Sequence, residues 1–235
     1  DMETGIVDAV VAGTYLTAAR TSCGSALAVQ KFCKSLNRLV LFGAGLQAQQ
    51  HVLAIRTALS LDKIPYITIV NRSATRAEEL KHELLERGWV EECHIALLSH
   101  SSRIAEAVRR ADVISTCTNS TTPLWDDAIS LQTSCVITGI GSYTKDMQEV
   151  PYGAVDQCAT ICIDTLEAKS VGDLKHHRLR DFQLLGQVLQ DDDNDNIPRT
   201  GPVFFKAVGT AIQDVLTADA VVQRAKELRI GTEVV

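Results

Sequence analysis

Short apolar runs alternate with amphipathic stretches along the middle of the chain. The runs that read as buried strands lie at residues 38–42, 67–70, 95–97, 113–115, 135–138 and 160–163, the third being the weakest. Between them, apolar residues recur at helical spacing, as Ala77, Leu80 and Leu84 do after the capping residue Ser73. This alternation predicts right-handed crossovers and an α/β fold with a doubly wound parallel sheet over roughly residues 36–165.

The flanking segments follow other patterns. A turn at Glu3 to Gly5 precedes an apolar run at 6–11 that predicts a strand, and Thr21 reads as the cap of a helix. A turn in the first residues implies an earlier strand, so we expect a fragment of a longer protein, with a natural processed end as the alternative. Residues 166–187 look helical and polar, and a closing helix is predicted from about Val208 to Gly231.

Composition excludes several classes of protein. The chain of 235 residues is 46% hydrophobic and carries a net charge of −6, which disfavours a general nucleic-acid binder. No apolar run approaches the roughly 18 residues that a membrane span needs, and the start lacks the layout of a signal peptide. Seven cysteines without a Cys-x-x-Cys pair favour reduced thiols in a cytoplasmic protein over a disulfide scaffold or zinc site.

The acidic stretch at 191–196 does not match a calcium-binding EF-hand loop. An EF-hand loop would need glycine at its sixth position and glutamate at its twelfth, where this chain has Asn196 and Pro202. A solvated loop is therefore expected there, and no metal site is predicted.

The strongest chemical signal is the G-x-G-x-x-A motif at residues 43–48, directly after a predicted strand and at the start of a helix. Gly43 allows the tight turn, Gly45 lets a pyrophosphate approach the backbone, and Ala48 lets the helix pack closely. The free N–H groups of the helix start favour phosphate binding. The motif alone is weak evidence for dinucleotide binding, but its position between a predicted strand and a predicted helix makes a dinucleotide site the better interpretation. Ala44, between the two glycines, is expected to be part of that site.

The end of the second predicted strand bears on which dinucleotide binds. NAD sites usually place an acidic residue there, whereas this chain has Asn71, Arg72 and Ser73, followed by Arg76 and no carboxylate before Glu78. Arginine presents a planar fork of donors that suits a phosphate, so NADP(H) is favoured over NAD(H). The alternative is an arginine that merely ends a strand.

Two more loops follow predicted strands at the same edge of the sheet. The polar loop at 116–123, with Thr118 and Asn119, is typical of a ligand-binding edge, although a generic turn would look similar. The loop at 139–142, with Ile140 and Ser142, could form the floor of the nicotinamide pocket.

Five motifs in a fixed order resemble the ornithine cyclodeaminase/mu-crystallin family. They lie at residues 16–21, 43–48, 71–73, 141–149 and 205–209. The resemblance covers essentially the whole chain, and it implies that about the first hundred residues of the family's chain are absent.

The resemblance implies a two-domain subunit that forms a homodimer. Its expected parts are residues 1–24, belonging to a split substrate and dimerisation domain, residues 25–165, the nucleotide-binding domain, and residues 166–235, the remainder of the split domain. It further implies that Arg20 binds the substrate carboxylate, that Leu46 and Gln47 contact the pyrophosphate, that residues 71–73 hold the adenosine end, and that Lys206 reaches the cofactor. From the residues alone, Arg20 could equally be ion-paired, and Lys206 would be a solvated lysine near a helix start.

One departure from the family pattern affects the expected reaction. Cyclodeaminases carry an aspartate after the fifth strand, where this chain has Ser142 and Tyr143, both candidates for the catalytic site; the nearest acid is Asp146. The resemblance therefore implies an NADP(H)-dependent oxidoreductase that transfers hydride to the C=N bond of a small imino acid, or the reverse. The alternatives are a lyase that converts ornithine to proline and ammonia, and a non-catalytic binding protein. The family's catalytic lysine would lie in the absent part.

Overall fold

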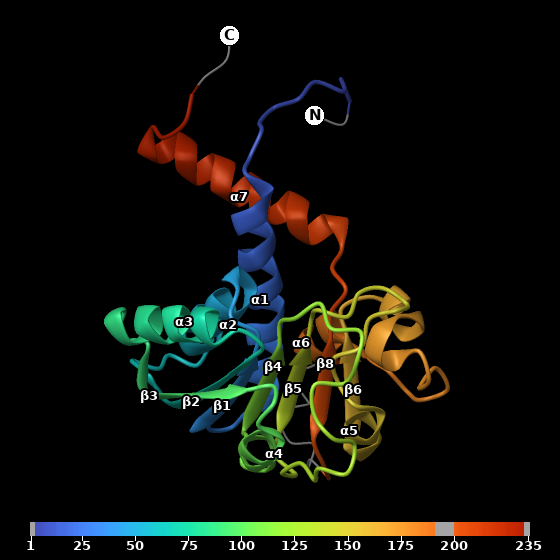
Figure 1. Cartoon of the computed structure of the whole chain (residues 1–235). Coiled ribbons are helices and arrows are strands. Elements are labelled where there is room, and N and C mark those ends of the chain that lie inside the picture. The colour runs from blue at the N-terminus through green and yellow to red at the C-terminus, as the bar shows by residue number, and fades with distance from the viewer. Residues whose placement is uncertain (1–2, 191–199, 233–235) are drawn as a thin grey trace.

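The fold is built on one eight-stranded sheet whose strands all pair in parallel, in the order β3-β2-β1-β4-β5-β8-β6-β7 (Figure 1). The structure is a computed structural model that describes residues 3–190 and 200–232. The strands are β1 Arg38–Phe42, β2 Ile64–Asn71, β3 Val90–Leu97, β4 Val113–Thr116, β5 Val136–Gly139, β6 Thr160–Ile163, β7 Gln183–Leu184 and β8 Val203–Lys206. The α-helices are α1 Gly13–Phe32, α2 Leu46–Ala58, α3 Ala74–Glu86, α4 Ser101–Arg109, α5 Tyr152–Gln157, α6 Leu185–Gln190 and α7 Ala211–Leu228.

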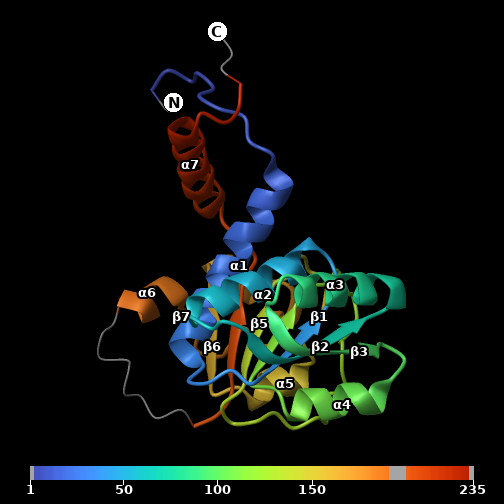
Figure 2. The ribbon, with the colours of Figure 1, turned by 90° about the vertical axis from the view of Figure 1, so that its left-hand side faces the viewer.

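Helices cover both faces of this sheet, which confirms the predicted doubly wound α/β class. One apolar core joins α1, α2 and α3 to one face, and a second joins α4 and α5 to the other (Figure 2). Ser73 accepts a hydrogen bond from the backbone N–H of Arg76 and caps α3, as predicted. The sheet also reaches beyond the predicted residues 36–165, because β7 and β8 extend it.

The start of the chain differs from the prediction. Residues 6–11 form no strand, and α1 begins at Gly13 rather than near Thr21. The β-branched residues of this segment favour a strand locally, but none of the described strands pairs with them: Ile6, Val7 and Val10 are 64%, 74% and 93% exposed. The turn at Glu3 is present as predicted.

The stretch from 166 to 187 was also wrongly predicted, as a polar helix. It forms two short 3-10 helices, Leu166–Ser170 and Gly172–Leu174, then β7 and the start of α6. The helical prediction failed because polar residues here point inward: Asp173 is fully buried, and His177 is 8% exposed and bonds to Asp156 at 3.0 Å. The acidic stretch at 191–196 lies outside the described residues.

The closing helix α7 is present, beginning at Ala211 with a capping box formed by Thr210 and Gln213. It crosses α1 away from the sheet (Figure 1). None of its residues is buried in this chain, and Ile212, Val215 and Leu216 are each more than 60% exposed.

A buried histidine joins α1 to α2. His51 is fully buried; its Nδ1 lies 2.7 Å from the carbonyl oxygen of Gln47, and its Nε2 lies 2.9 Å from Oγ of Ser25. Burial lowers the pKa of His51 to about 4, against an ordinary value of 6.5, although the Gln47 carbonyl opposes the shift. The ring is therefore neutral in the folded protein at neutral pH.

This shift predicts a loss of stability in mild acid. Between pH 6.5 and about 4 the unfolded state binds a proton at His51 that the folded state does not. The contribution of His51 to the unfolding free energy is therefore fully present above pH 6.5 and is lost as the pH falls towards 4. We expect His51 to contribute a decrease of about 2 kcal/mol in unfolding free energy between about pH 7 and pH 5. Urea unfolding of wild type and His51→Gln across this range measures it; parallel pH profiles for the two proteins would contradict it.

Candidate functional site

The candidate site is a cavity of about 560 Å³ at the carboxyl edge of the sheet, where β1, β2 and β4 end. Ligands of doubly wound folds bind at this edge, beside the point where the strand order reverses. Its lining residues are Gly43, Ala44, Gly45, Val70, Asn71, Arg72, Arg76, Leu98, Cys117, Thr118, Asn119, Ser120, Thr121, Thr122 and Leu124.

The turn after β1 has a backbone shape that requires glycine. Gly43 has φ +107°, and a Cβ there would lie 2.7 Å from the carbonyl oxygen of Cys117, so the absence of a side chain lets the loops after β1 and β4 touch. Gly45 caps α2 without a side-chain hydrogen bond to the helix start. Nearby, the buried Oε1 of Gln47 has no hydrogen-bond partner within the described residues. Such a helix start fits an anionic group, as a pyrophosphate would supply.

Two arginines lie at the β2 end of the cavity. Arg72 and Arg76 are exposed and line it, beyond the end of β2. The side-chain amide of Asn71 donates to the carbonyl of Ser73 at 2.9 Å, which holds the short turn that carries Arg72. This end of the cavity is therefore positively charged.

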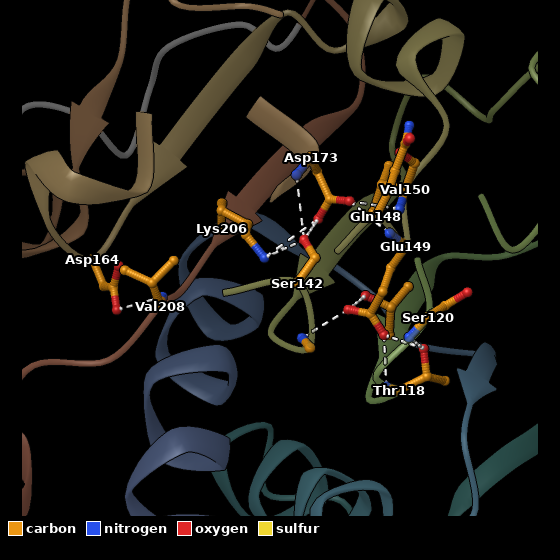
Figure 3. A network of polar contacts seen from close by, with 12 residues as sticks. Thr118, Ser120, Ser142, Gln148, Glu149, Val150, Asp164, Asp173, Lys206 and Val208 are labelled. Atoms are coloured by element: carbon orange, nitrogen blue, oxygen red, sulfur yellow. Dashed lines mark hydrogen bonds and ion pairs between the residues drawn. The ribbon is translucent and has the colours of Figure 1, made fainter. Parts of the chain in front are cut away.

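Behind the wall of the cavity, Glu149 links two loops. One carboxylate oxygen accepts from the backbone N–H and the hydroxyl of Thr118, at 2.6 and 2.7 Å, and the other accepts from the Thr116 hydroxyl at 2.8 Å and the Gly141 N–H at 2.7 Å (Figure 3). Glu149 is fully buried. It therefore ties the loop after β4 to the loop after β5.

Asp173 ties the same region to β8. Its Oδ1 accepts from the backbone N–H groups of Glu149 and Val150, at 2.7 and 3.0 Å, and its Oδ2 lies 3.3 Å from Nζ of Lys206. The Ser142 hydroxyl lies between the charges: it donates to Asp173 at 2.5 Å and accepts from Lys206 at 2.9 Å (Figure 3). Buried ionic groups are tolerated when they are paired and hydrogen-bonded in this way.

Burial also governs the pKa values of two groups near the cavity. It raises the pKa of the Glu149 carboxyl, while the Lys206 ammonium and the hydrogen bonds from Thr118 oppose the rise. Burial and the nearby Glu149 hold the pKa of the Cys117 thiol well above its usual range. A thiol with a raised pKa is a poor nucleophile, so Cys117 is a weak candidate for catalysis although it lines the cavity.

The structure brings part of the predicted site together at this cavity. The predicted residues that line it are Gly43, Ala44, Gly45, Asn71, Arg72, Arg76, Thr118 and Asn119. The predicted residues that do not line it are Arg20, Leu46, Gln47, Ser73, Ile140, Ser142, Tyr143 and Lys206. Tyr143 is 55% exposed, whereas Ile140 and Ser142 are buried.

Two predicted environments were wrong. Arg20 does not come before the helix whose cap was predicted at Thr21; it lies within α1, and its guanidinium bonds to Asp214 at 3.0 Å and Gln213 at 3.2 Å on α7. Lys206 is not a solvated lysine near a helix start; it is the last residue of β8, fully buried, and paired with Asp173. The apolar run Val203–Phe205 before it is the signal that could have indicated a buried strand.

Sequence reasoning missed Glu149 and Asp173. Glu149 belongs to one of the motifs of the family resemblance, but it was assigned no role there. Asp173 falls in the stretch that was predicted as a polar helix, and a single buried acid among solvated ones leaves no periodic signal. Within residues 3–190 and 200–232, no cluster of His, Cys, Asp and Glu could hold a metal ion, and no helix could cross a membrane.

Comparison with known proteins gives one family. The model of the ornithine cyclodeaminase/mu-crystallin family matches residues 1–229. The chain is 27% identical to a Delta(1)-pyrroline-2-carboxylate reductase of Bacillus cereus, over 100% of this chain and 72% of that protein. It is 29% identical to the ketimine reductase mu-crystallin of Macropus fuliginosus, over 94% of this chain and 66% of that protein.

Solved structures agree with this result. The iminosuccinate reductase of Paracoccus denitrificans in complex with NAD+ matches with a TM-score of 0.82 and 26% identity, over 100% of this chain and 71% of that one. A Delta(1)-pyrroline-2-carboxylate reductase of Thermococcus litoralis shares the fold, with a TM-score of 0.85 at 20% identity, over 100% of this chain and 72% of that one.

Proposed function

This chain belongs to the ornithine cyclodeaminase/mu-crystallin family, and we propose that it is an oxidoreductase that uses a nicotinamide dinucleotide to reduce the C=N bond of a small imino acid. The observation that carries the proposal is the cavity at the sheet edge, which is lined by a glycine turn and by Arg72 and Arg76. The relatives named above are reductases of imino compounds, which favours the same substrate class.

The chemistry divides between the cofactor and the chain. When bound, a reduced nicotinamide would supply the hydride that the imine carbon accepts, and water would supply the proton for the imine nitrogen. The chain's contribution is to position the dinucleotide: α2 offers its free N–H groups, and the loops that Glu149 holds form the inner wall.

The assay that tests this proposal follows the absorbance of the reduced nicotinamide with a panel of imino acids, beginning with Delta(1)-pyrroline-2-carboxylate, and with ornithine as a separate substrate. Net oxidation of the cofactor with an imino acid is the expected result. Ammonia release from ornithine without net cofactor turnover would instead show a cyclodeaminating lyase. Dinucleotide binding with no turnover of any substrate would leave a non-catalytic binding protein.

The lyase remains the second candidate because the family also includes cyclodeaminases. The loop after β5 argues against it: Ser142, where those enzymes carry an aspartate, is buried and bonded to Asp173 and Lys206, and Tyr143 points to solvent. The acids behind this loop, Glu149 and Asp173, are fully buried and already hydrogen-bonded.

We further propose that NADP(H) is preferred over NAD(H), through Arg72. Arg72→Asp removes the guanidinium and places a repelling charge beside a 2′-phosphate. We expect wild type to bind NADPH more tightly than NADH, and the variant to reverse this order, as measured by titrating cofactor fluorescence. Arg87→Asp, at the far end of α3 and paired with Glu83 at 2.8 Å, is the matched control and should keep the wild-type order. Equal affinities of wild type for both cofactors would reject the assignment.

We propose that Arg20 binds the substrate carboxylate. Its side chain is 14% exposed, and its guanidinium lies against Gly209, just after the buried Lys206. Arg20→Lys keeps the charge but loses the fork, and we expect kcat/KM for imino acids to fall about ten-fold with little change in nucleotide affinity. The same substitution at the exposed Arg224 of α7 is the control. If Arg20→Lys lowers thermal stability but leaves kcat/KM unchanged, Arg20 only joins α1 to α7.

We also propose that the protein forms a homodimer and divides as the resemblance implies, into residues 1–24, 25–165 and 166–235. The exposed apolar side chains of α7 support this proposal, because a helix with no buried residue in its own chain is typical of an interface.

A further inference from the structure

The buried polar network holds unequal numbers of opposite charges. Glu149, Asp173 and Lys206 are each fully buried, and we call them the buried trio. Two carboxylates and one ammonium sum to −2 + 1 = −1 when all three are ionised. Asp164 has partners of its own: its Oδ2 accepts from the backbone N–H groups of Val208 and Gly209, at 3.0 and 2.7 Å. Figure 3 shows the contact with Val208.

The hydrogen bonds favour the ionised form of Glu149. Each of its oxygens accepts a backbone N–H, from Thr118 on one side and from Gly141 on the other. A backbone N–H can only donate, so these contacts stabilise the carboxylate over the neutral acid. Asp173 likewise accepts two backbone N–H groups besides its contact with Lys206. Burial raises the pKa of Glu149, and these hydrogen bonds together with Lys206 oppose the rise. With all three groups ionised, the excess negative charge rests on Glu149.

This charge lies directly behind the cavity wall. Thr118, which lines the cavity, donates its N–H and its hydroxyl to Glu149, so one residue separates the carboxylate from the cavity. Cys117 also lies on this wall, where burial raises the pKa of its thiol and the nearby Glu149 adds to the rise. In an interior of low dielectric, an unneutralised charge at this position acts strongly on a ligand in the cavity.

We infer that the buried trio tunes the redox preference of the site, its net negative charge favouring the oxidised, cationic nicotinamide over the neutral reduced form. The inference rests on the proposed function, because it needs a nicotinamide dinucleotide in the cavity with its nicotinamide ring beside Thr118. Glu149 acts through the wall and is a positioning residue that sets the electrostatics of the site. The charge favours hydride donation by the same physics, since the nicotinamide becomes positive as the hydride leaves.

The test compares the dissociation constants of the oxidised and reduced forms of one dinucleotide, measured by calorimetry. Glu149→Gln and Asp173→Asn each remove one negative charge while keeping the shape of the side chain. Thr116→Val is the matched control: it removes one hydrogen bond to Glu149 from a buried position and changes no charge. Circular dichroism establishes which variants fold. One folded charge variant, either Glu149→Gln or Asp173→Asn, is sufficient for the test.

We expect the ratio of the oxidised-form to the reduced-form dissociation constant to rise about ten-fold in the charge variants, and less than about two-fold in Thr116→Val. A folded charge variant that weakens both forms equally, or leaves the ratio unchanged, would show that the trio is only structural and overturn the inference. If wild type binds neither form, the proposed function fails, and the inference fails with it.

Discussion

Replacing Asp173 by alanine should lower the free energy of unfolding by about 3–5 kcal/mol, because it breaks a fully buried ion pair. The Lys206 ammonium, 3.3 Å from Asp173, would be left in the interior without its carboxylate. The backbone N–H groups of Glu149 and Val150 would also lose their acceptor, and each unsatisfied buried donor adds to the cost. Urea unfolding at neutral pH measures the effect.

The matched control removes an exposed carboxylate from an ion pair of the same kind. Glu106 on α4 lies 3.4 Å from Arg110, and its side chain is 69% exposed. Because exposed pairs contribute little, Glu106→Ala should change the unfolding free energy by less than about 0.5 kcal/mol. Similar losses in the two variants would show that water reaches Asp173 and Lys206, and would refute the buried pair.

The features that sequence reasoning placed correctly are those whose cause is local. The run Arg38–Phe42 is apolar because both faces of β1 are covered, and the glycines after it follow from the shape of one turn. Ser73 caps α3 through a contact three residues away. Each signal lies within a few residues of the structure it predicts.

The features that it missed depend on partners far apart in the chain. Lys206 is buried because Asp173, 33 residues earlier, neutralises it, and no local pattern distinguishes such a lysine from a solvated one. Residues 6–11 have the composition of a strand, but a strand needs a sheet edge beside it, and α1 begins instead. In both cases a distant partner, and not the local sequence preference, determined the structure.

The part of the candidate site nearest the motifs was therefore predictable, and the part behind them was not. The glycine turn and Arg72 are visible as a motif and as a strand end, and both line the cavity. Glu149 lies behind Thr118 and accepts its backbone N–H, but the sequence around Glu149 resembles that of an ordinary acidic loop and does not indicate a buried residue. The buried charges that support a site cannot be predicted from the sequence, because only the fold brings these acids together.

Gly141→Ala should be strongly destabilising, because the added Cβ has no space. It would lie 1.7 Å from the carbonyl oxygen of Thr118 and 2.6 Å from the carboxyl carbon of Glu149, so the loops after β4 and β5 would have to move apart. Their separation would strain the backbone and break the hydrogen bond from the Gly141 N–H to Glu149. We expect a loss of about 4 kcal/mol in unfolding free energy.

The same substitution at Gly24 is the control, and it should act in the opposite direction. Gly24 lies within α1, and a Cβ there would meet no atom within 4 Å. Alanine is the better helix former, so Gly24→Ala should raise stability by up to about 1 kcal/mol. Thermal and urea unfolding of both variants separates a general effect of the methyl group from the packing at Gly141. If Gly141→Ala is tolerated, the loops after β4 and β5 are not held together by Glu149, and the wall of the cavity has another support.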